Sequence, residues 1–152
     1  MAEEVSAEKA KEIIEMLTGG GSIDSINTSL ALGILPLVES IGDHDLLERL
    51  VEHAQKVAAD EIEKGWSRFE HLKRNAGSID DIAELAFHAE SLEKGEPLAA
   101  AVLHHHALML LSIEDTESAQ TSVRRSLTLR ESIGDKEGTV SVSYTHLRAH
   151  ET

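Results

Sequence analysis

The chain of 152 residues is 41% hydrophobic but only 3% aromatic, and it carries a formal net charge of -14. This length predicts one domain with a sizeable core, and the scarcity of aromatic residues favours helices packed through Leu, Ile, Val and Ala over a β-sandwich or barrel. The negative charge argues against nucleic acid and anionic membranes as partners. Because the chain has no cysteine, disulfides and thiolate zinc sites are excluded.

The N-terminal segment predicts an amphipathic helix from Ser6 to Leu17, where three glycines follow and end it. The first residues are acidic, unlike those of a signal peptide. No apolar run in the chain approaches the roughly 18 residues that a membrane span needs. We therefore expect a cytoplasmic protein that does not enter the membrane.

Three further helices are predicted before residue 78. The apolar stretch 26–41 forms the first of them, and Pro36 is expected to kink or interrupt it because proline lacks an amide donor. The segment Asp43 to Lys64 keeps a helical period for about five turns and predicts one long helix, which Gly65 stops or bends. A shorter helix then covers residues 66–75.

A helix over 78–95 and a helix hairpin over 98–135 complete the predicted elements. In the hairpin, apolar residues recur at helical spacing on both sides of a short polar break. Asp115 or Thr116 can cap the second helix, and Gly134 is suited to end it. A connection of about four residues requires the two helices to be antiparallel.

This hairpin resembles a tetratricopeptide repeat, in which large and small side chains of the two helices alternate at the contact. These roles fall to Leu103, Ala107, Leu110, Ala119, Val123 and Ser126. The pentapeptide Glu-Ser-Ile-Gly-Asp occurs at 39–43 and again at 131–135, which we interpret as an internal echo. The resemblance implies an all-α fold, a TPR-like α-solenoid of about seven helices in antiparallel pairs with a period of about 37–41 residues.

The resemblance also implies a concave groove for a protein or peptide ligand. Its lining would comprise Lys64, Ser67, His71, Arg74, Asn75, His104, Leu108 and Ser112. The basic and amide side chains of this set could hold carboxylates of a peptide by charge-assisted hydrogen bonds. The alternative is a solvated basic face that pairs with neighbouring acids.

Nine histidines raise the alternative of a metal site. The run His104-His105-His106 cannot converge on one ion, because consecutive helical residues are splayed by about 100°. Glu84 and His88 have the spacing of a ligand pair, but no further ligand is evident. We expect His106 to be buried, His105 to lie on the surface and His104 to face the groove. The sequence predicts no catalytic residues, no bound metal and no cofactor.

The preferred functional hypothesis is therefore a non-enzymatic scaffold that binds a protein or peptide. Two alternatives are a regulatory or sensory arm of a larger signalling protein and a His-rich helical metal-binding protein. Residues 142–152, VSYTHLRAHET, resemble a translated sequencing-library adapter. We expect them to be a non-native tail on a helical-repeat domain of residues 1–140, whose natural chain continues past Val140. The oligomeric state is left open.

Overall fold

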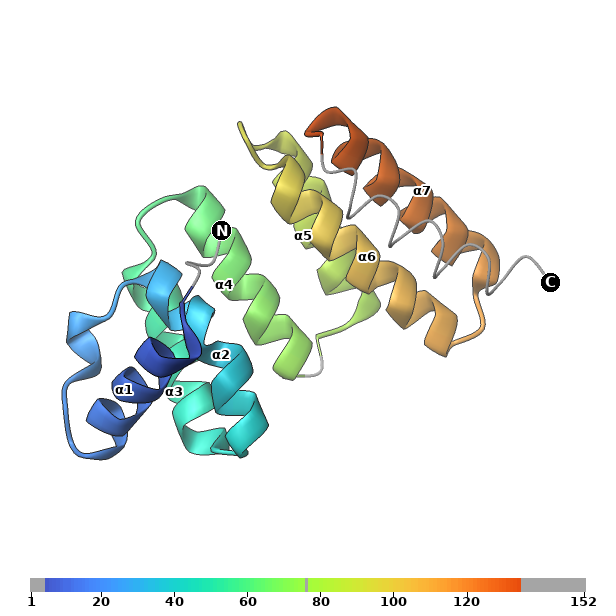
Figure 1. Ribbon diagram of the computed structural model, residues 1–152. Coiled ribbons are helices and arrows are strands. Elements are labelled where there is room, and N and C mark those ends of the chain that lie inside the picture. Colours follow the sequence, from blue (N-terminus) through green and yellow to red (C-terminus); the bar gives the residue numbers. More distant parts are fainter. Residues whose placement is uncertain (1–4, 76, 135–152) are drawn as a thin grey trace. The chain divides into compact units, whose positions relative to one another are not determined.

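The computed structural model describes residues 5–75 and 77–134 (Figure 1). Within these ranges seven α-helices pack mainly against their neighbours in sequence, in the manner of stacked helix hairpins. The predicted all-α class is thus confirmed. The helices are α1 (Ala7–Thr18), α2 (Thr28–Ile41), α3 (His44–Val57), α4 (Glu61–Arg74), α5 (Ile79–Ser91), α6 (Glu96–Ser112) and α7 (Thr116–Ser132), with a short 3-10 helix at Ile23–Ser25.

The chain divides into two units, Met1–His71 and Leu72–Thr152, and the division falls inside α4. Each unit is described by itself. The expected domain end at Val140 and the adapter-like residues 142–152 lie outside the described residues. In the described part of the chain, no helix is both long enough and apolar enough to cross a membrane.

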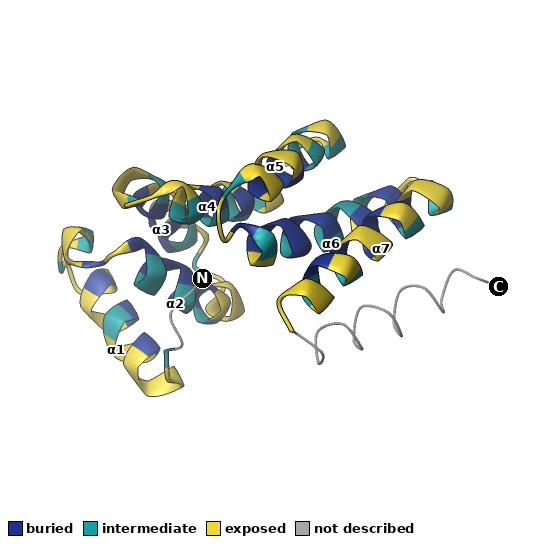
Figure 2. Cartoon of the chain, turned by 90° about the horizontal axis from the view of Figure 1, so that it is seen from above, coloured by how far each residue is buried: buried dark blue, intermediate teal, exposed yellow. Residues whose placement is uncertain are grey.

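The core of the first unit lies between α1, α2 and α3. Its centre consists of aliphatic side chains that are almost completely inaccessible to solvent: Ala31, Ile34, Val38, Leu50 and Ala54. Residues at this spacing face one side of a helix, so two amphipathic helices bury them against each other. Figure 2 shows the corresponding buried stripes, with exposed residues on the outer side of α1.

Two hydrogen bonds of buried polar side chains fasten α2 and its preceding turn to α3. The hydroxyl of Thr28 donates to the carbonyl of Ala54 over 2.8 Å, and the Nε2 atom of His53 lies 2.6 Å from the carbonyl oxygen of Ile26. A carbonyl oxygen only accepts, so Nε2 of His53 must carry the proton. Both side chains therefore make a hydrogen bond inside the core, which offsets the cost of removing them from water.

The prediction of one long helix from Asp43 to Lys64 is wrong, because α3 ends at Val57 and a separate helix, α4, begins at Glu61. Asp60 caps the new helix: its carboxylate accepts from the amide of Glu63 over 2.8 Å. The carboxylate of Glu63 reaches back to the amide of Ala59 over 2.9 Å. This reciprocal arrangement satisfies amides that a helix start leaves open. Gly65, predicted to stop or bend that helix, is a buried residue inside α4 and does not end it.

Pro36 does not interrupt α2, which runs from Thr28 to Ile41 with the proline inside it. Proline removes one intrahelical hydrogen bond and leaves the carbonyl of the preceding turn without that partner. Pro36 itself is exposed. The helix continues past the proline, so of the two predicted outcomes, a kink or an interruption, the interruption is wrong.

The second unit contains the helix hairpin that the sequence predicts. Asp115 caps α7 by accepting from the amide of Ser118 over 3.2 Å, and α6 ends at Ser112. Between the helices, the hydroxyl of Ser126 donates to the carbonyl of Ala100 over 2.8 Å. The contact cluster of this hairpin is made of Ala107, Leu110, Ala119 and Val123. All four belong to the small and bulky set singled out in the sequence.

Helix α5 completes the second unit by packing on α6. It begins with a capping box, in which Ser78 and Asp81 exchange side-chain-to-backbone hydrogen bonds. Near the end of α5, the carboxylate of Glu90 accepts a hydrogen bond from Nε of Arg125 over 2.7 Å, which links α5 to α7. The described part of the second unit is therefore tied together through all three of its complete helices.

The two copies of the echoed pentapeptide end their helices in the same way. Gly42 directly follows α2 with φ +76°, and Gly134 lies two residues after the last residue of α7 with φ +78°. Each glycine amide bonds to a carbonyl three residues earlier, that of Glu39 or Glu131. Glycine reaches this left-handed region without a steric penalty, so the predicted helix end at Gly134 is confirmed.

Candidate functional site

Three residues of the predicted groove lie on the first-unit part of α4. Lys64 is exposed and pairs over 3.2 Å with Glu61 one turn earlier, both side chains being 57% exposed. His71 is half-buried. Ser67 is fully buried, and its hydroxyl donates to the carbonyl of Glu63 over 2.8 Å. Its predicted place on a solvent-facing lining is therefore corrected, because its side chain faces the interior and its donor is used within the helix.

The other five predicted residues lie in the second unit. At the end of α4, Arg74 is half-buried and Asn75 is exposed. On α6, His104, Leu108 and Ser112 follow one another at steps of four residues, which places them on one stripe of the helix. Along this stripe the side chains go from half-buried to exposed, and Leu108 is 40% exposed.

The last turn of α4 lies close enough to α6 to act on it electrostatically. Burial lowers the pKa of His105, and the positive charge of Lys73 lowers this pKa further, followed by that of His106. Burial also lowers the pKa of Arg74, although a guanidinium stays protonated at neutral pH. A basic turn therefore borders the middle of α6. The predicted groove set omits Lys73, although Lys73 belongs to the same basic run of the sequence.

The histidine run occupies a different environment from the one predicted. His105 is half-buried rather than on the surface, and His106 is half-buried rather than fully buried. The Nδ1 atom of His106 lies 2.8 Å from the hydroxyl oxygen of Ser122 on α7. Burial lowers the pKa of His106, while the carboxylate of Asp80 acts in the opposite direction. The burial of His105 and His106 is therefore determined by the packing of α6 against its neighbours and not by the fact that they are consecutive histidines.

The contact of His106 with Ser122 joins α6 to α7. Ser122 is only 7% exposed, so little of this residue is open to solvent. A nucleophilic serine must instead present its oxygen to a reacting carbonyl while a histidine takes its proton. The pair therefore supplies a polar tie inside the hairpin.

The stability of the second unit is expected to fall when the pH drops below about 6.5, the ordinary pKa of histidine in an unfolded chain. Folding lowers the pKa values of His105 and His106, so the unfolded chain binds more protons than the folded chain in this pH range. The neutral imidazoles contribute stability above that pH, and this contribution is lost as the pH falls towards their folded pKa values. Urea denaturation followed by circular dichroism from pH 7.5 to about 5.5 measures the effect.

A His106→Gln variant tests this pH dependence. The control is His44→Gln, because His44 is exposed on α3. His106→Gln should weaken the dependence, leaving the contribution of His105, and should do so more than His44→Gln. A free energy of unfolding that rises as the pH falls would contradict the prediction.

Within residues 5–75 and 77–134, no three His, Asp or Glu side chains gather in a way that could hold a metal ion. The pair at metal-ligand spacing, Glu84 and His88, is exposed on α5. Two ligands on one exposed helix face leave most of the coordination to water and bind a metal weakly.

Comparison of the sequence with protein-family models and with curated proteins, and of the fold with solved structures, finds no match.

Proposed function

We propose that this chain is a protein-binding scaffold of tetratricopeptide-like helix hairpins, and that its second unit binds an acidic, partly apolar peptide at the end of α4 and along α6. The observation that carries the proposal is the exposure of Lys73 and Asn75 at the end of α4 and of Leu108 and Ser112 on α6, all within one compact unit. The influence of the Lys73 charge on the pKa of His105 agrees with a short separation between the end of α4 and α6.

The repeat character is supported by the packing inside the hairpin. Ala107 and Ala119 are each 1% exposed and meet in one cluster with Leu110 and Val123. Small side chains at these positions let two helices approach closely, and the bulky ones fill the remaining space. The same alternation is what the sequence resemblance to a tetratricopeptide repeat requires.

The chemistry of the surface favours a ligand with carboxylates next to an apolar side chain. Lys73 and Asn75 are exposed and can donate hydrogen bonds, and those from an ammonium to a carboxylate are among the stronger hydrogen bonds in proteins. Leu108 supplies apolar area that a ligand leucine can cover. Lys64 pairs with Glu61, which fits the alternative of a solvated basic face for the earlier turns of α4.

A fluorescently labelled peptide of alternating glutamate and leucine tests this proposal by fluorescence anisotropy. We expect the wild-type chain to bind it, and the double variant Lys73→Ala, Leu108→Asn to bind at least about tenfold more weakly, which is about 1.4 kcal/mol. Arg124→Ala is the matched control, because it removes an exposed positive charge from α7. Circular dichroism verifies that each variant is folded.

Lys64→Ala and His71→Ala test whether the ligand contact extends along α4. If these variants bind the peptide more weakly, the earlier turns of α4 also belong to the binding surface. If Arg124→Ala weakened binding as much as the double variant, the interaction would reflect overall charge, and the proposed surface would be wrong.

A further inference from the structure

The first unit contains a hollow between α1 and α2. Its volume is about 440 Å³, and it is lined by Ala7, Lys11, Ile14, Glu15, Leu37 and Ile41. Ile14 is buried at its inner side, with 7% of its surface exposed, whereas Ile41 is 55% exposed. The hollow is therefore an apolar depression that solvent reaches along one edge.

The hollow arises from the residues that α1 presents to the end of α2. Ala7 is too small to cover Ile41, and the side chain of Lys11 keeps its charged end in water. Ile14 is the first bulky residue of this face that becomes buried in the core. Large apolar side chains of α2 are thus left with one side uncovered beyond the point where α1 packs on it.

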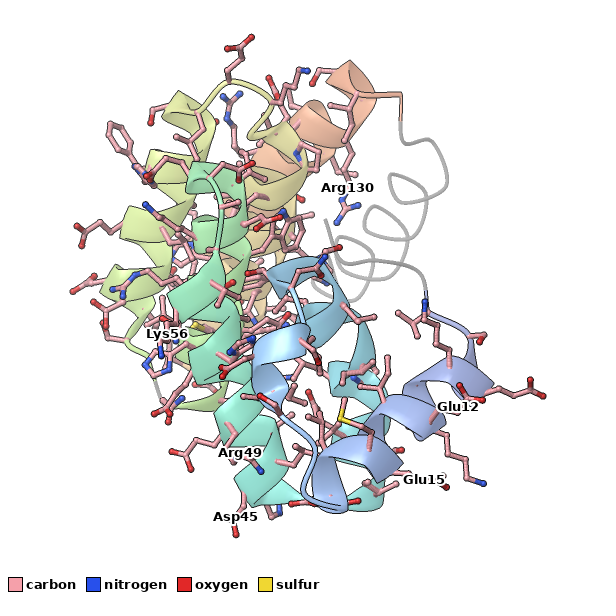
Figure 3. All side chains as sticks on the ribbon, turned by 90° about the vertical axis from the view of Figure 1, so that its left-hand side faces the viewer. Glu12, Glu15, Asp45, Arg49, Lys56 and Arg130 are labelled. Atoms are coloured by element: carbon pink, nitrogen blue, oxygen red, sulfur yellow. The ribbon has the colours of Figure 1, made fainter. Side chains whose placement is uncertain are left out.

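The lining of the hollow holds one base, Lys11, and one acid, Glu15, and the two helices that form it carry an excess of acids. The exposed charged residues of α1 and α2 comprise four acids, Glu8, Glu12, Glu15 and Glu39, and two bases, Lys9 and Lys11. The last turn of α2 has no basic residue, so the negative end of its helix dipole, near Ile41, is not compensated from within the helix. Figure 3 shows Glu12 and Glu15 on the outer side of α1.

We propose that this hollow is a second binding site, and that its ligand is an amphipathic helix with leucine-like residues on one face and lysine or arginine beside them. An uncovered apolar groove between two helices accepts the apolar face of a third helix, and the acidic surroundings select a cationic partner. The α1 residues from Ala7 to Glu15 span about 12 Å at 1.5 Å per residue, which corresponds to about two turns of the ligand.

The size of the hollow agrees with this ligand. A volume of about 440 Å³ lies in the range of about 300–1,000 Å³ that is usual for binding sites. It accommodates apolar side chains inserted from one face of a helix, while the helix backbone stays outside. One inserted side chain would cover Ile41, and a basic side chain of the ligand would lie near Glu15.

The experiment uses the full chain and a labelled amphipathic peptide of leucine and lysine, whose apolar residues follow a helical period. A peptide in which glutamate replaces every lysine is the charge-reversed control. We expect the lysine peptide to bind and the glutamate peptide of the same pattern to bind at least about tenfold more weakly at this site. Glu15→Gln should weaken binding of the lysine peptide more than Glu48→Gln, since Glu48 is exposed on α3.

The chain itself offers a matched control for the apolar contact. Ile41 and Ile133 stand in the same Glu-Ser-Ile-Gly sequence at a helix end, and both are exposed, by 55% and 41%. Ile41→Asn should weaken binding of the lysine peptide about tenfold, whereas Ile133→Asn should leave it unchanged. Both substitutions are at exposed positions, so circular dichroism should show the same helicity as the wild-type chain.

Three results would overturn the proposal: absence of binding, equal loss of affinity in Ile41→Asn and Ile133→Asn, and equal binding of the two peptides by the Lys73→Ala, Leu108→Asn variant, in which the surface proposed for acidic peptides is removed. Concentration-dependent self-association that Ile41→Asn abolishes would assign the hollow to a second copy of the chain and would also overturn it. The acidic alternating peptide and the Lys73 variant test a different surface, so the two binding proposals fail or succeed separately.

Discussion

Replacing Leu50 by alanine is expected to lower the free energy of unfolding of the first unit by about 2–5 kcal/mol. Leu50 is 0% exposed in the middle of α3 and belongs to the core that α2 and α3 share. The substitution loses the free energy that burial of the removed groups contributes to folding. It also leaves a cavity that the neighbouring side chains fill only in part. Urea denaturation followed by circular dichroism measures the change as a lower transition midpoint.

Leu47→Ala is the control on the same helix. Leu47 is half-buried and packs against the edge of the same core, so its truncation leaves no closed cavity and should cost about 1 kcal/mol. Equal effects of the two substitutions would contradict the proposed position of the core centre at Leu50.

Gly95→Ala is expected to destabilise the second unit by about 1–3 kcal/mol. Gly95 is buried at the junction of α5 and α6, where its amide bonds to the carbonyl of Leu92 over 3.0 Å. A methyl group at this position would overlap with the carbonyl oxygen of Ala89 and lie 3.0 Å from Cβ of Leu92. The obstacle is backbone, which cannot rotate away as a flexible side chain would, so the helix junction itself must shift.

The matched control for this substitution is Gly19→Ala. Both changes are from glycine to alanine, so the loss of unfolded-chain entropy is the same, and Gly19 and Gly95 share a φ of -86° beside a helix, which alanine adopts without backbone strain. Gly19 is exposed, and its added methyl group would lie 3.1 Å from the carbonyl oxygen of Glu15, which a small shift accommodates. Thermal denaturation should show a lower midpoint for Gly95→Ala than for Gly19→Ala, and the reverse order would contradict the steric argument.

Local sequence signals predicted the second unit well. The cap at Asp115 and the helix end at Gly134 depend on hydrogen bonds between residues a few positions apart, which a sequence contains in full. The alternation of small and bulky residues around Ala107 and Ala119 predicted the contact between α6 and α7 that the structure contains. Between α3 and α4 the apolar period continues across the break, and the capping signature of Asp60 and Glu63 was overlooked.

The residues of the candidate groove could be predicted only in part, because the exposure of each side chain depends on contacts with residues distant in the sequence. Spacing places Ser67 on one helix face with Lys64 and His71, but it does not say which faces neighbouring helices cover, and Ser67 is fully buried. His105 is half-buried and influenced by Lys73, a relation across more than thirty residues that no local pattern encodes. The hollow beside Ile41 also escaped prediction, since it results from what α1 fails to cover.

The shared ends of α2 and α7 imply that these helices stop for a reason contained in a few residues. Gly42 and Gly134 have nearly the same φ and the same amide hydrogen bond to the carbonyl three residues earlier, although they lie in different units, so the surrounding side chains do not dictate these features. The segment should behave as a transplantable stop signal: grafted onto the end of an unrelated helix, it would halt that helix at its glycine and redirect the chain there.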